Sequence, residues 1–495
     1  MMLRLILVFL IFLFFSAAAI LYLSFPLNSA KGFVSIEDKK FKLNGKDFYP
    51  VAVNYIISTR ADKNGMWACP YFGYSPDSVL PPDTKEACIL QLKADMELIK
   101  EIGFNAVRFV GIGEESVNKK TGFLSVYTRN GERGDTIIPL TSEANYEKYF
   151  NALEELFNAA SSAGLKIIFL IRVFPEVEST EEHLRKLAIR FKADTSIMAY
   201  DLFNEPLYFD SLERNKIEVP PIVKRWSKIL KMYAPNQLST IGMQGMREIF
   251  EWDPNMLDVD FISFHPYEVE PEQVRNELFW YGKYINKPWI IGETGIPADN
   301  DSVTYEEQKK WAHKTLKQAY DCGASGYSWW QYKEVEWGHY HANFLGVVTR
   351  KGITKTMKES LIVQGTPKPL TEEFKKFNPA NKKDSCICLS NYYNYSQNKE
   401  FRIIGRLSDE NNIPIEGGVI VAWNQWWSNS NYTSSKKDGR FELLGSFQFY
   451  HWMASATEYS MIRADISPDS AKIYTDSIPT INVGNIKVNK IDIEK

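Results

Sequence analysis

Eight short apolar segments alternate with amphipathic segments of helical period between residues 48 and 331. The apolar segments are FYPVAVN, FNAVRFV, KIIFLI, SIMAYDLF, QLSTIGM, DFISFH, PWIIGE and GYSWWQ. Apolar runs of this length are typical of strands buried on both faces of a parallel sheet. The helical pattern lies between them, for example in residues 85–103 and 145–164, which both end at a capping Gly. These units predict an α/β fold with a (β/α)8 TIM barrel over residues 31–365 and functional groups at the strands' carboxyl ends.

The composition changes beyond residue 365. Residues 366–385 are rich in Pro, Lys and Asn, which favours a linker. Residues 386–495 contain short alternating segments separated by turn residues, namely FRIIGRL, GGVIVAWN, GRFELLG and INVGNIKVNKIDI. This pattern predicts an all-β sandwich that serves as an accessory domain.

Residues 1–30 have the pattern of a targeting segment. Arg4 precedes a run that is almost wholly apolar from Leu5 to Phe25, and this run is long enough to span a bilayer. Ala17, Ala18 and Ala19 supply small residues for cleavage, but the apolar run continues past them. A removed signal peptide and a membrane anchor through residues 5–25 therefore both remain open. Either one predicts export, to a secreted, periplasmic or cell-surface location.

Charge and cysteine usage exclude some classes of partner. The net charge of −3 gives no electrostatic reason to expect a nucleic-acid partner, and we expect a monomer. Cys69 and Cys88 flank one loop that they can bridge, and Cys322 lies at a predicted helix end. Cys386 and Cys388 have no second Cys pair and no nearby His, so we expect no zinc site. We expect unpaired or structural thiols, and we expect no metal or other cofactor.

Two glutamates end apolar segments that we predict to be buried strands. Glu205 lies in AYDLFNEP and Glu293 in PWIIGETG. An ionisable group at such a position is costly without a purpose. If the fourth and seventh barrel strands carry them, they face each other across the mouth of the barrel, where two carboxyl groups can cleave an acetal. A separation of about 5 Å would predict a retaining mechanism. The alternative is a pair of salt-bridge partners at the rim.

Six motifs occur in an order that resembles a known family. They are the lead-in FKLNGKDFYPVAVNY, FNAVRFVG with Arg108, NEP at residues 204–206, HPY at 265–267, GETG with Glu293, and WWQ at 329–331. Together they resemble glycoside hydrolases of clan A, most nearly family 5, the group of cellulases and β-mannanases. The likeness covers about residues 33–365. It implies that Glu205 is the catalytic acid/base and Glu293 the nucleophile.

The resemblance also implies roles for substrate-binding residues. Arg108 and the Tyr267 hydroxyl would keep Glu293 ionised and depress its pKa, whereas Glu205 would keep its proton near neutrality. Asn204 would bind the sugar 2-hydroxyl. His265 would line the same subsite, although a lone histidine after a strand is often only structural.

The remaining aromatic and basic residues leave alternatives open. Neighbouring strand residues alternate in direction, so only one of Trp329 and Trp330 faces the mouth, and we assign Trp330 beneath the sugar. Four aromatic residues follow the first predicted strand, namely Trp67, Tyr71, Phe72 and Tyr74. They either stack on sugar rings at the mouth or pack against the protein beneath their loop. His339 and His341 are spaced like ligands but lack an evident partner. Arg172 stands where many family 5 enzymes carry a histidine, and it would suit an acidic sugar.

These observations predict a retaining hydrolase of β-linked polysaccharide, with β-mannan or β-glucan as substrate. The segment GRLSDENNIPIEGGVIVAW…SSKKDGRFELLG resembles carboxypeptidase-regulatory-like, prealbumin-like domains, which are often accessories. The alternative function is a non-catalytic glycan-binding or surface-assembly protein, in which the barrel is only a scaffold. Such a binder has no need for two facing carboxylates.

Overall fold

The structure is a computed structural model. It describes residues 30–76, 78–111, 124–128, 136–171, 174–175, 179–267, 272–394, 396, 399–466, 472–475 and 478–492. The predicted signal peptide or anchor lies outside this part of the chain, apart from residue 30. Among the residues that are described, no helix is both long enough and apolar enough to cross a bilayer.

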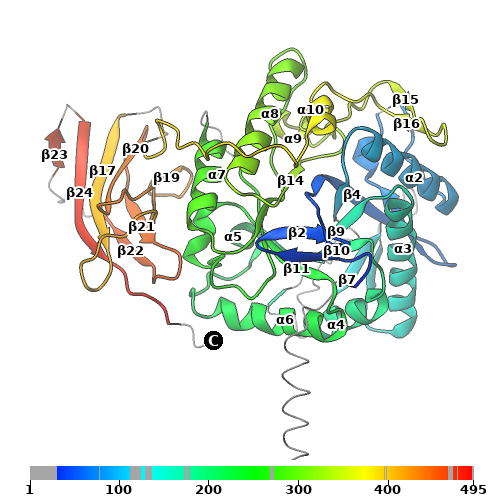
Figure 1. The fold of residues 1–495 in the computed structure, drawn as a ribbon, viewed down its shortest axis with the longest axis horizontal. Helices are drawn as coiled ribbons and strands as arrows, with labels where there is room; N and C mark the ends of the chain where they lie inside the picture. Colours follow the sequence, from blue (N-terminus) through cyan, green and yellow to red (C-terminus); the bar gives the residue numbers. More distant parts are fainter. Residues whose placement is uncertain are drawn as a thin grey trace, which may run out of the picture.

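Eight parallel strands close into a barrel (Figure 1). The last strand pairs with the first, with Tyr327 opposite Val51, so this sheet has no free edge in the barrel. The prediction of a (β/α)8 TIM barrel is confirmed. Its strands are β4 (Val51–Ala61), β6 (Ala106–Val110), β9 (Lys166–Leu170), β10 (Ile197–Asn204), β11 (Leu238–Met243), β12 (Ile262–Phe264), β13 (Trp289–Ile291) and β14 (Gly326–Trp329).

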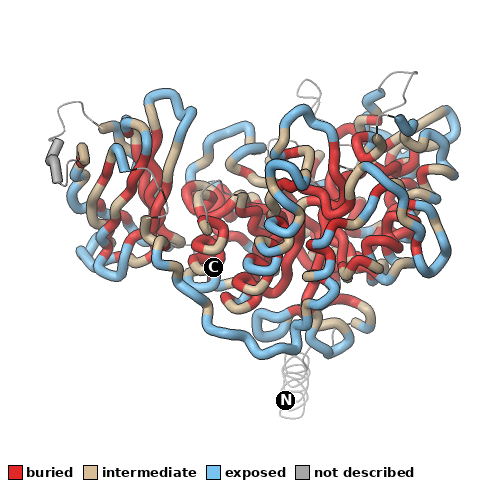
Figure 2. The backbone as a smooth tube through the Cα atoms, turned by 90° about the horizontal axis from the view of Figure 1, so that it is seen from above, coloured by how far each residue is buried: buried red, intermediate tan, exposed pale blue. Residues whose placement is uncertain are grey.

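Helices surround the barrel, and three of them begin at side-chain caps. Thr84 and Ser142 each accept a backbone N–H of the first turn, and Thr304 forms a capping box with Glu307. The buried backbone, red in Figure 2, runs through the barrel and continues into the C-terminal region. The main helices are α2 (Lys85–Glu101), α3 (Glu143–Ser162), α4 (Thr180–Phe191), α6 (Val219–Tyr233), α7 (Gln273–Tyr284) and α8 (Tyr305–Asp321).

A small antiparallel sheet covers the amino-terminal end of the barrel. It consists of β1 (Val34–Glu37), β2 (Lys40–Leu43) and β3 (Lys46–Asp47). Phe41 packs edge-on against Phe261 with ring centroids 5.1 Å apart, and it shares an apolar cluster with Met198 and Ile290 of the barrel strands. Because this end is plugged, the open mouth is at the carboxyl ends of the strands.

Short elements follow the strands at that mouth. The first strand extends into a hairpin with β5 (Met66–Pro70), and a second ribbon follows β6. The latter pairs β7 (Ser125–Thr128) with β8 (Thr136–Pro139), and the single turns are η1 (Phe72–Tyr74), α5 (Pro206–Phe209), η3 (Met246–Phe250) and α9 (Tyr340–Asn343).

The segment that we predicted as a linker is folded against the barrel. A hairpin of β15 (Ile353–Lys355) and β16 (Ile362–Gln364) leads to α10 (Thr371–Lys376), whose Phe374 is buried against Phe104 with centroids 4.8 Å apart. The chain then returns to the end of α8.

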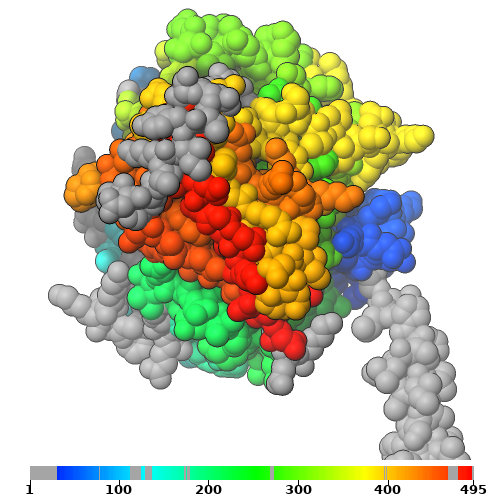
Figure 3. All heavy atoms as spheres, turned by 90° about the vertical axis from the view of Figure 1, so that its left-hand side faces the viewer, coloured from blue at the N-terminus to red at the C-terminus, as the bar shows by residue number. Residues whose placement is uncertain are grey.

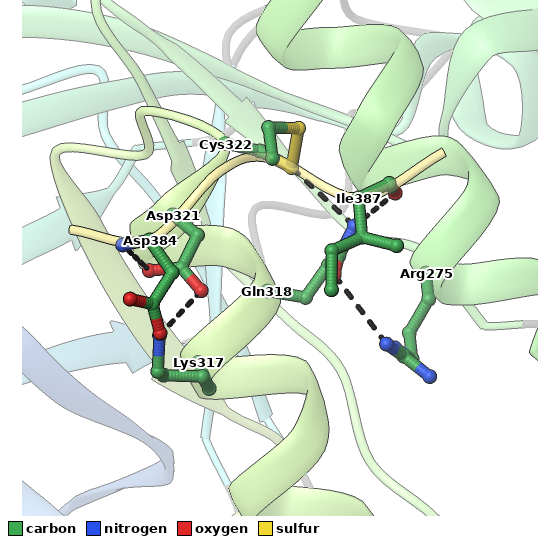
Figure 4. The surroundings of a disulfide bond; sticks show 8 residues. Arg275, Lys317, Gln318, Asp321, Cys322, Asp384 and Ile387 are labelled. Atoms are coloured by element: carbon green, nitrogen blue, oxygen red, sulfur yellow. Dashed lines mark hydrogen bonds and ion pairs between the residues drawn. A yellow bond between two sulfur atoms is a disulfide. The ribbon is translucent and has the colours of Figure 1, made fainter. Parts of the chain in front are cut away.

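A disulfide joins Cys322 to Cys386 at this point (Figure 4). The Gln318 side chain donates to the carbonyl oxygen of Ile387 at 2.8 Å beside it. Our expectation of unpaired thiols is wrong for these two cysteines, because the fold brings together residues that are 64 positions apart. Cys69 and Cys88 lie side by side with their sulfur atoms 2.8 Å apart and are buried and free.

The C-terminal region consists of two four-stranded sheets, consistent with the predicted sandwich. The side chains of Ile403, Phe441 and Ile420 belong to the core of this region. One sheet has the order β20 (Arg440–Gly445), β17 (Phe401–Ser408), β24 (Ile478–Lys487) and β23 (Lys472–Thr475), and the other has the order β19 (Ser430–Ser434), β18 (Val419–Trp423), β21 (His451–Ser455) and β22 (Ile462–Asp465).

The sandwich packs directly on the barrel (Figure 3). Along β18 the side chains alternate, so that Ile420 lies in the sandwich core whereas Val419 and Val421 join the apolar cluster of the barrel. Trp280 of α7 donates its indole N–H to the Gly417 carbonyl oxygen at 2.8 Å. The sandwich therefore shares a core with the barrel on its α7 side.

Candidate active site

The two glutamates lie together at the mouth of the barrel. Glu205 directly follows β10 and Glu293 follows β13. His265 lies between them, with its Nδ1 2.9 Å from Glu205 Oε1 and 3.7 Å from Glu293 Oε1. One carboxylate oxygen of each glutamate and one ring nitrogen of His265 all lie within 4.8 Å of one another. Both carboxyl groups therefore reach one shared space.

Arg108 on β6 joins the polar groups beneath this space. Its side chain is fully buried, and its Nη1 donates to Glu293 Oε1 at 2.5 Å. Its Nε donates to Asp201 Oδ2 at 2.8 Å, and its Nη2 donates to Asn204 Oδ1 at 2.7 Å. The guanidinium thus fixes an aspartate and an asparagine of β10 and the glutamate that follows β13.

Burial and hydrogen bonding act in opposite directions on Glu293. Burial raises the pKa of this carboxyl group, and the positive charge of Arg108 opposes the shift. The Tyr267 hydroxyl donates to Glu293 Oε2 at 3.1 Å. Our expectation that Arg108 and Tyr267 depress this pKa below its ordinary value is wrong in the net direction, because the carboxyl group lies deeper than the sequence indicates.

Glu205 has fewer stabilising donors. Burial raises its pKa to about 7, and Arg108 opposes the shift. The ion pair of Arg108 goes to Glu293, so a proton shared by the two carboxyl groups belongs on Glu205. The Glu205 backbone has a φ of 45°, in the left-handed region, where a side chain is strained. Its backbone N–H donates to the Gly242 carbonyl oxygen at 2.7 Å, which helps to hold that conformation.

His265 is buried and uncharged. Burial lowers its pKa to about 4, so it is neutral at pH 7. Two glycines give the ring its space. A Cβ at Gly292 would lie 2.8 Å from His265 Nε2, and one at Gly242 would lie 2.5 Å from His265 Cε1. Larger residues at either position would push the ring toward the glutamates.

A cavity of about 370 Å³ opens above these groups and is lined by Asn204 and Glu293. Its size falls within the range of small-molecule sites. Trp330 and Trp337 line one part, with ring centroids 6.4 Å apart. The Trp337 indole N–H donates to the Tyr71 hydroxyl at 2.8 Å, and this hydrogen bond orients the rings of Trp337 and Tyr71. Polar groups and aromatic faces thus meet in one cavity.

The other aromatic predictions divide between the cavity and the core. Trp330 lines the cavity, whereas Trp329 is fully buried and donates to the Leu345 carbonyl oxygen. Trp67 and Tyr74 are buried and act in packing. The His339 side chain caps the short helix α9. Arg172 lies outside the described residues.

Several residues of the site are absent from the sequence-based prediction. Asp201 and Asn54 both accept hydrogen bonds from Arg108, and Trp337 lines the cavity. Glu248 on η3 is buried and accepts the backbone N–H groups of Leu207 and Gln244. Burial raises its pKa to about 8. For Asp201 and Asn54 a signal existed, since each is a polar residue between apolar or aromatic neighbours within a strand.

The cluster of Glu205, His265 and Glu293 is the one set of side chains with metal-ligand spacing in the described part of the chain. Arg108 already donates to one of the Glu293 oxygens that a metal ion would need. The arginine supplies positive charge at that position, so the arrangement fits proton transfer and carboxylate chemistry better than metal binding.

Comparison with known proteins identifies the family. Residues 82–333 match the family model described as Cellulase (glycosyl hydrolase family 5). The chain belongs to glycosyl hydrolase family 5. The match includes Arg108, Glu205 and Glu293, the charged residues of the mouth described above. No curated protein matches the sequence.

Solved structures with distant similarity include three glycosidases. A β-glucuronidase from Ruminococcus gnavus has 18% identity and a TM-score of 0.44, over 69% of this chain and 52% of that chain. A GH5_18 enzyme from Streptomyces cattleya with Manβ1-4GlcNAc has 15% identity and a TM-score of 0.40, over 52% and 70%. An endo-1,4-β-mannanase from Rhizomucor miehei has 15% identity and a TM-score of 0.42, over 60% and 90%. The family 5 chain spans about half the length of the β-glucuronidase.

Proposed function

We propose that this enzyme hydrolyses β-linked polysaccharide with retention of configuration, and that Glu205 and Glu293 carry the reaction. The observation that supports this most is the proximity of their carboxylate oxygens, within 4.8 Å of each other. Retaining glycosidases hold their carboxyl groups about 5 to 5.5 Å apart, whereas inverting enzymes leave more room for a water molecule.

In the first step, Glu293 attacks the anomeric carbon. Its Oε1 is held by Arg108 and its Oε2 by Tyr267, so the carboxylate is fixed in position. Glu205 donates its proton to the leaving oxygen as the glycosidic bond breaks. Its pKa of about 7 leaves the acid form well populated at neutral pH.

In the second step, water cleaves the bond between the sugar and Glu293. The ester is uncharged, so the repulsion that favours protonation of Glu205 disappears. Glu205 then accepts a proton from the incoming water, and the released Glu293 carboxylate regains its ion pair with Arg108. The same two residues thus serve both steps.

The neighbouring side chains bind the sugar. Asn204 accepts from Arg108 through Oδ1, which leaves its amide N–H groups to face the cavity and the 2-hydroxyl. Trp330 offers its ring as the floor of the subsite. His265 holds Glu205 in place through their 2.9 Å contact.

The proposed substrates are β-glucan and β-mannan, and the family description favours β-glucan. We also propose that the enzyme is exported by its N-terminal segment, as a monomer, and that residues 5–25 either anchor it or are removed. An acidic sugar bound by Arg172 is a further option. A comparison of neutral and uronate-bearing glycans in an Arg172→Ala variant tests it, because equal losses on both would exclude it.

A polysaccharide panel tests the proposed reaction. Purified enzyme is incubated with β-glucans and β-mannans, new reducing ends are measured, and the anomeric configuration of the first product is followed by NMR. Release of a product that retains the β-configuration supports the proposal. An α-configured first product would exclude the double displacement, and no release from any glycan would favour a scaffold that only binds glycans.

A further inference from the structure

Two tryptophans project from the turn between β18 and β19 of the sandwich. Trp426 is 79% exposed and Trp427 is 47% exposed. Large aromatic side chains that lie together on a surface often mark a binding site. Neither residue belongs to the active site, and neither contributes to the core of the sandwich.

The turn that carries them is held rigidly. The side chain of Asn424 accepts the backbone N–H of Ser428 at 3.0 Å and donates to the Ser428 hydroxyl at 2.8 Å. Trp427 has a φ of 56°, in the left-handed region, which is unfavourable for a bulky residue. Such strain persists only where the surroundings hold it, and it concentrates at functional sites.

The inner tryptophan is packed on one side. Its ring centroid lies 4.1 Å from that of Trp423, which is buried. The Arg463 guanidinium lies 5.2 Å from the Trp423 ring and 5.7 Å from the Trp427 ring. Trp423 and Arg463 therefore fix the orientation of the Trp427 ring, whereas the Trp426 ring is exposed to solvent.

An ion pair joins β22, which lies beside this turn, to the segment that follows β10. Arg463 Nη1 donates to Glu213 Oε1 at 3.0 Å. Glu213 lies on the segment that begins at Glu205, and on the same segment Phe209 lines the cavity and Tyr208 is exposed. The segment that follows Glu205 thus contacts the arginine that lies beside Trp427.

We infer that Trp426 and Trp427 form a second glycan-binding site, which holds part of the polysaccharide whose cleavage occurs in the barrel. The apolar faces of indoles match the C–H faces of pyranose rings. The neighbouring polar groups of Asn424, Ser428 and Asn429 suit sugar hydroxyls. The identity of the ligand rests on the proposed function.

The composition of the turn favours a sugar over a membrane surface. A membrane-binding loop combines apolar residues with unpaired cations. Here amide and hydroxyl side chains surround the tryptophans, and the nearby Arg463 is paired with Glu213.

The test compares a Trp426→Ala/Trp427→Ala variant with an Ile413→Ala control. Ile413 is 60% exposed and precedes β18, at the opposite end of that strand. The tryptophan variant and the control are both made in the full chain. Each also carries Glu293→Gln, so that no polysaccharide is hydrolysed during the binding measurement. Binding is measured by depletion on insoluble cellulose and insoluble β-mannan. The tryptophan variant should bind at least about tenfold more weakly than the control, a loss of about 1.4 kcal/mol.

A second measurement uses the same substitutions with Glu293 intact. Hydrolysis of a short aryl β-glycoside should be unchanged, while hydrolysis of the insoluble polymer falls. Equal melting temperatures check that the variants are folded. Equal binding of the tryptophan variant and the control would overturn the inference, as would loss of binding to phosphatidylglycerol vesicles without loss of glycan binding. Because binding is measured without turnover, an absence of hydrolysis would contradict only the proposed reaction.

Discussion

An ionic cluster at the contact between barrel and sandwich and another in the mouth of the barrel are both buried, and they differ in how fully their charges are matched. At the contact between barrel and sandwich, Lys216 Nζ lies 2.8 Å from Asp253 Oδ2. It also donates to the carbonyl oxygens of Ala456 and Tyr459 and to the Ser455 hydroxyl. In the mouth of the barrel, one arginine serves both Asp201 and Glu293, and Glu205 lies close by with no cation of its own.

The difference separates structural from chemical roles. One cation and one carboxylate with filled hydrogen bonds form a structural anchor. The mouth contains more buried carboxyl groups than cations among its described residues. Burial raises the pKa values of Glu205 and Glu293 there, so these carboxyl groups can gain and lose a proton during a reaction. The following predictions test this contrast, beginning with the largest expected effect.

Replacement of Glu293 should abolish catalysis but leave the barrel folded. In Glu293→Ala we expect kcat/KM on soluble polysaccharide to fall at least about a thousandfold, because the nucleophile is lost. Added azide should restore part of the rate by occupying the vacated space. Circular dichroism and melting temperature check the fold, with Glu293→Gln as the isosteric control. Full activity in either variant would contradict the assignment.

Replacement of Lys216 should have the opposite outcome. Lys216→Met leaves Asp253 buried without its cation, and the free energy of unfolding should fall by about 3 to 5 kcal/mol. Hydrolysis of an aryl glycoside below the melting temperature should change less than tenfold. Urea unfolding measures the first quantity. A Lys216→Met/Asp253→Leu variant should recover part of the stability, and a variant that is stable but inactive would reverse the contrast.

The pH dependence should report the proton on Glu205. Its acid form is required for cleavage, so kcat/KM should fall about tenfold per pH unit above about pH 7. In Glu205→Gln this alkaline decline should vanish for aryl glycosides whose leaving group needs no protonation. A decline that persists in the variant would assign the acid to another residue.

Glu248 should produce a smaller effect, on stability alone. Its pKa is about 8 in the folded chain, against an ordinary value of 4.5, so the folded state binds the extra proton. The free energy of unfolding should therefore decrease as the pH rises from about 4.5 to 8. Glu248→Gln lacks this pH dependence, which amounts to about 1.4 kcal/mol for each pH unit between the two pKa values, and should be more stable than the parent protein at pH 8.5. Identical pH–stability curves for both would show that Glu248 is ionised when folded.

The parts of the fold that local pattern determines were predictable from the sequence. The apolar segment that ends in Glu205 forms β10, and the segment that ends near Glu293 forms β13. Once two strand ends are known, closure of the barrel brings their side chains together. Arg108 lies at the mouth because it occupies a position of β6, and Trp330 lies there because it directly follows β14.

Contacts between distant segments were not predictable. Nothing near Lys216 indicates that Asp253 and a sandwich turn will surround it, and nothing near Cys322 indicates Cys386. The net pKa direction of Glu293 was also missed, since it depends on how deeply the closed barrel buries the group. In each case the property arises from parts of the chain that meet only in the folded protein.

The short stretch between Glu205 and Lys216 has a practical consequence for protein engineers. The proposed proton donor, Glu205, lies at one end. At the other end, Lys216 forms hydrogen bonds with the C-terminal region. Grafting a foreign module in place of that region would release this end of the stretch. The barrel and the sandwich are therefore not interchangeable parts, and a chimera has to carry over the contact residues of Lys216 and Glu213 to keep this end of the stretch anchored.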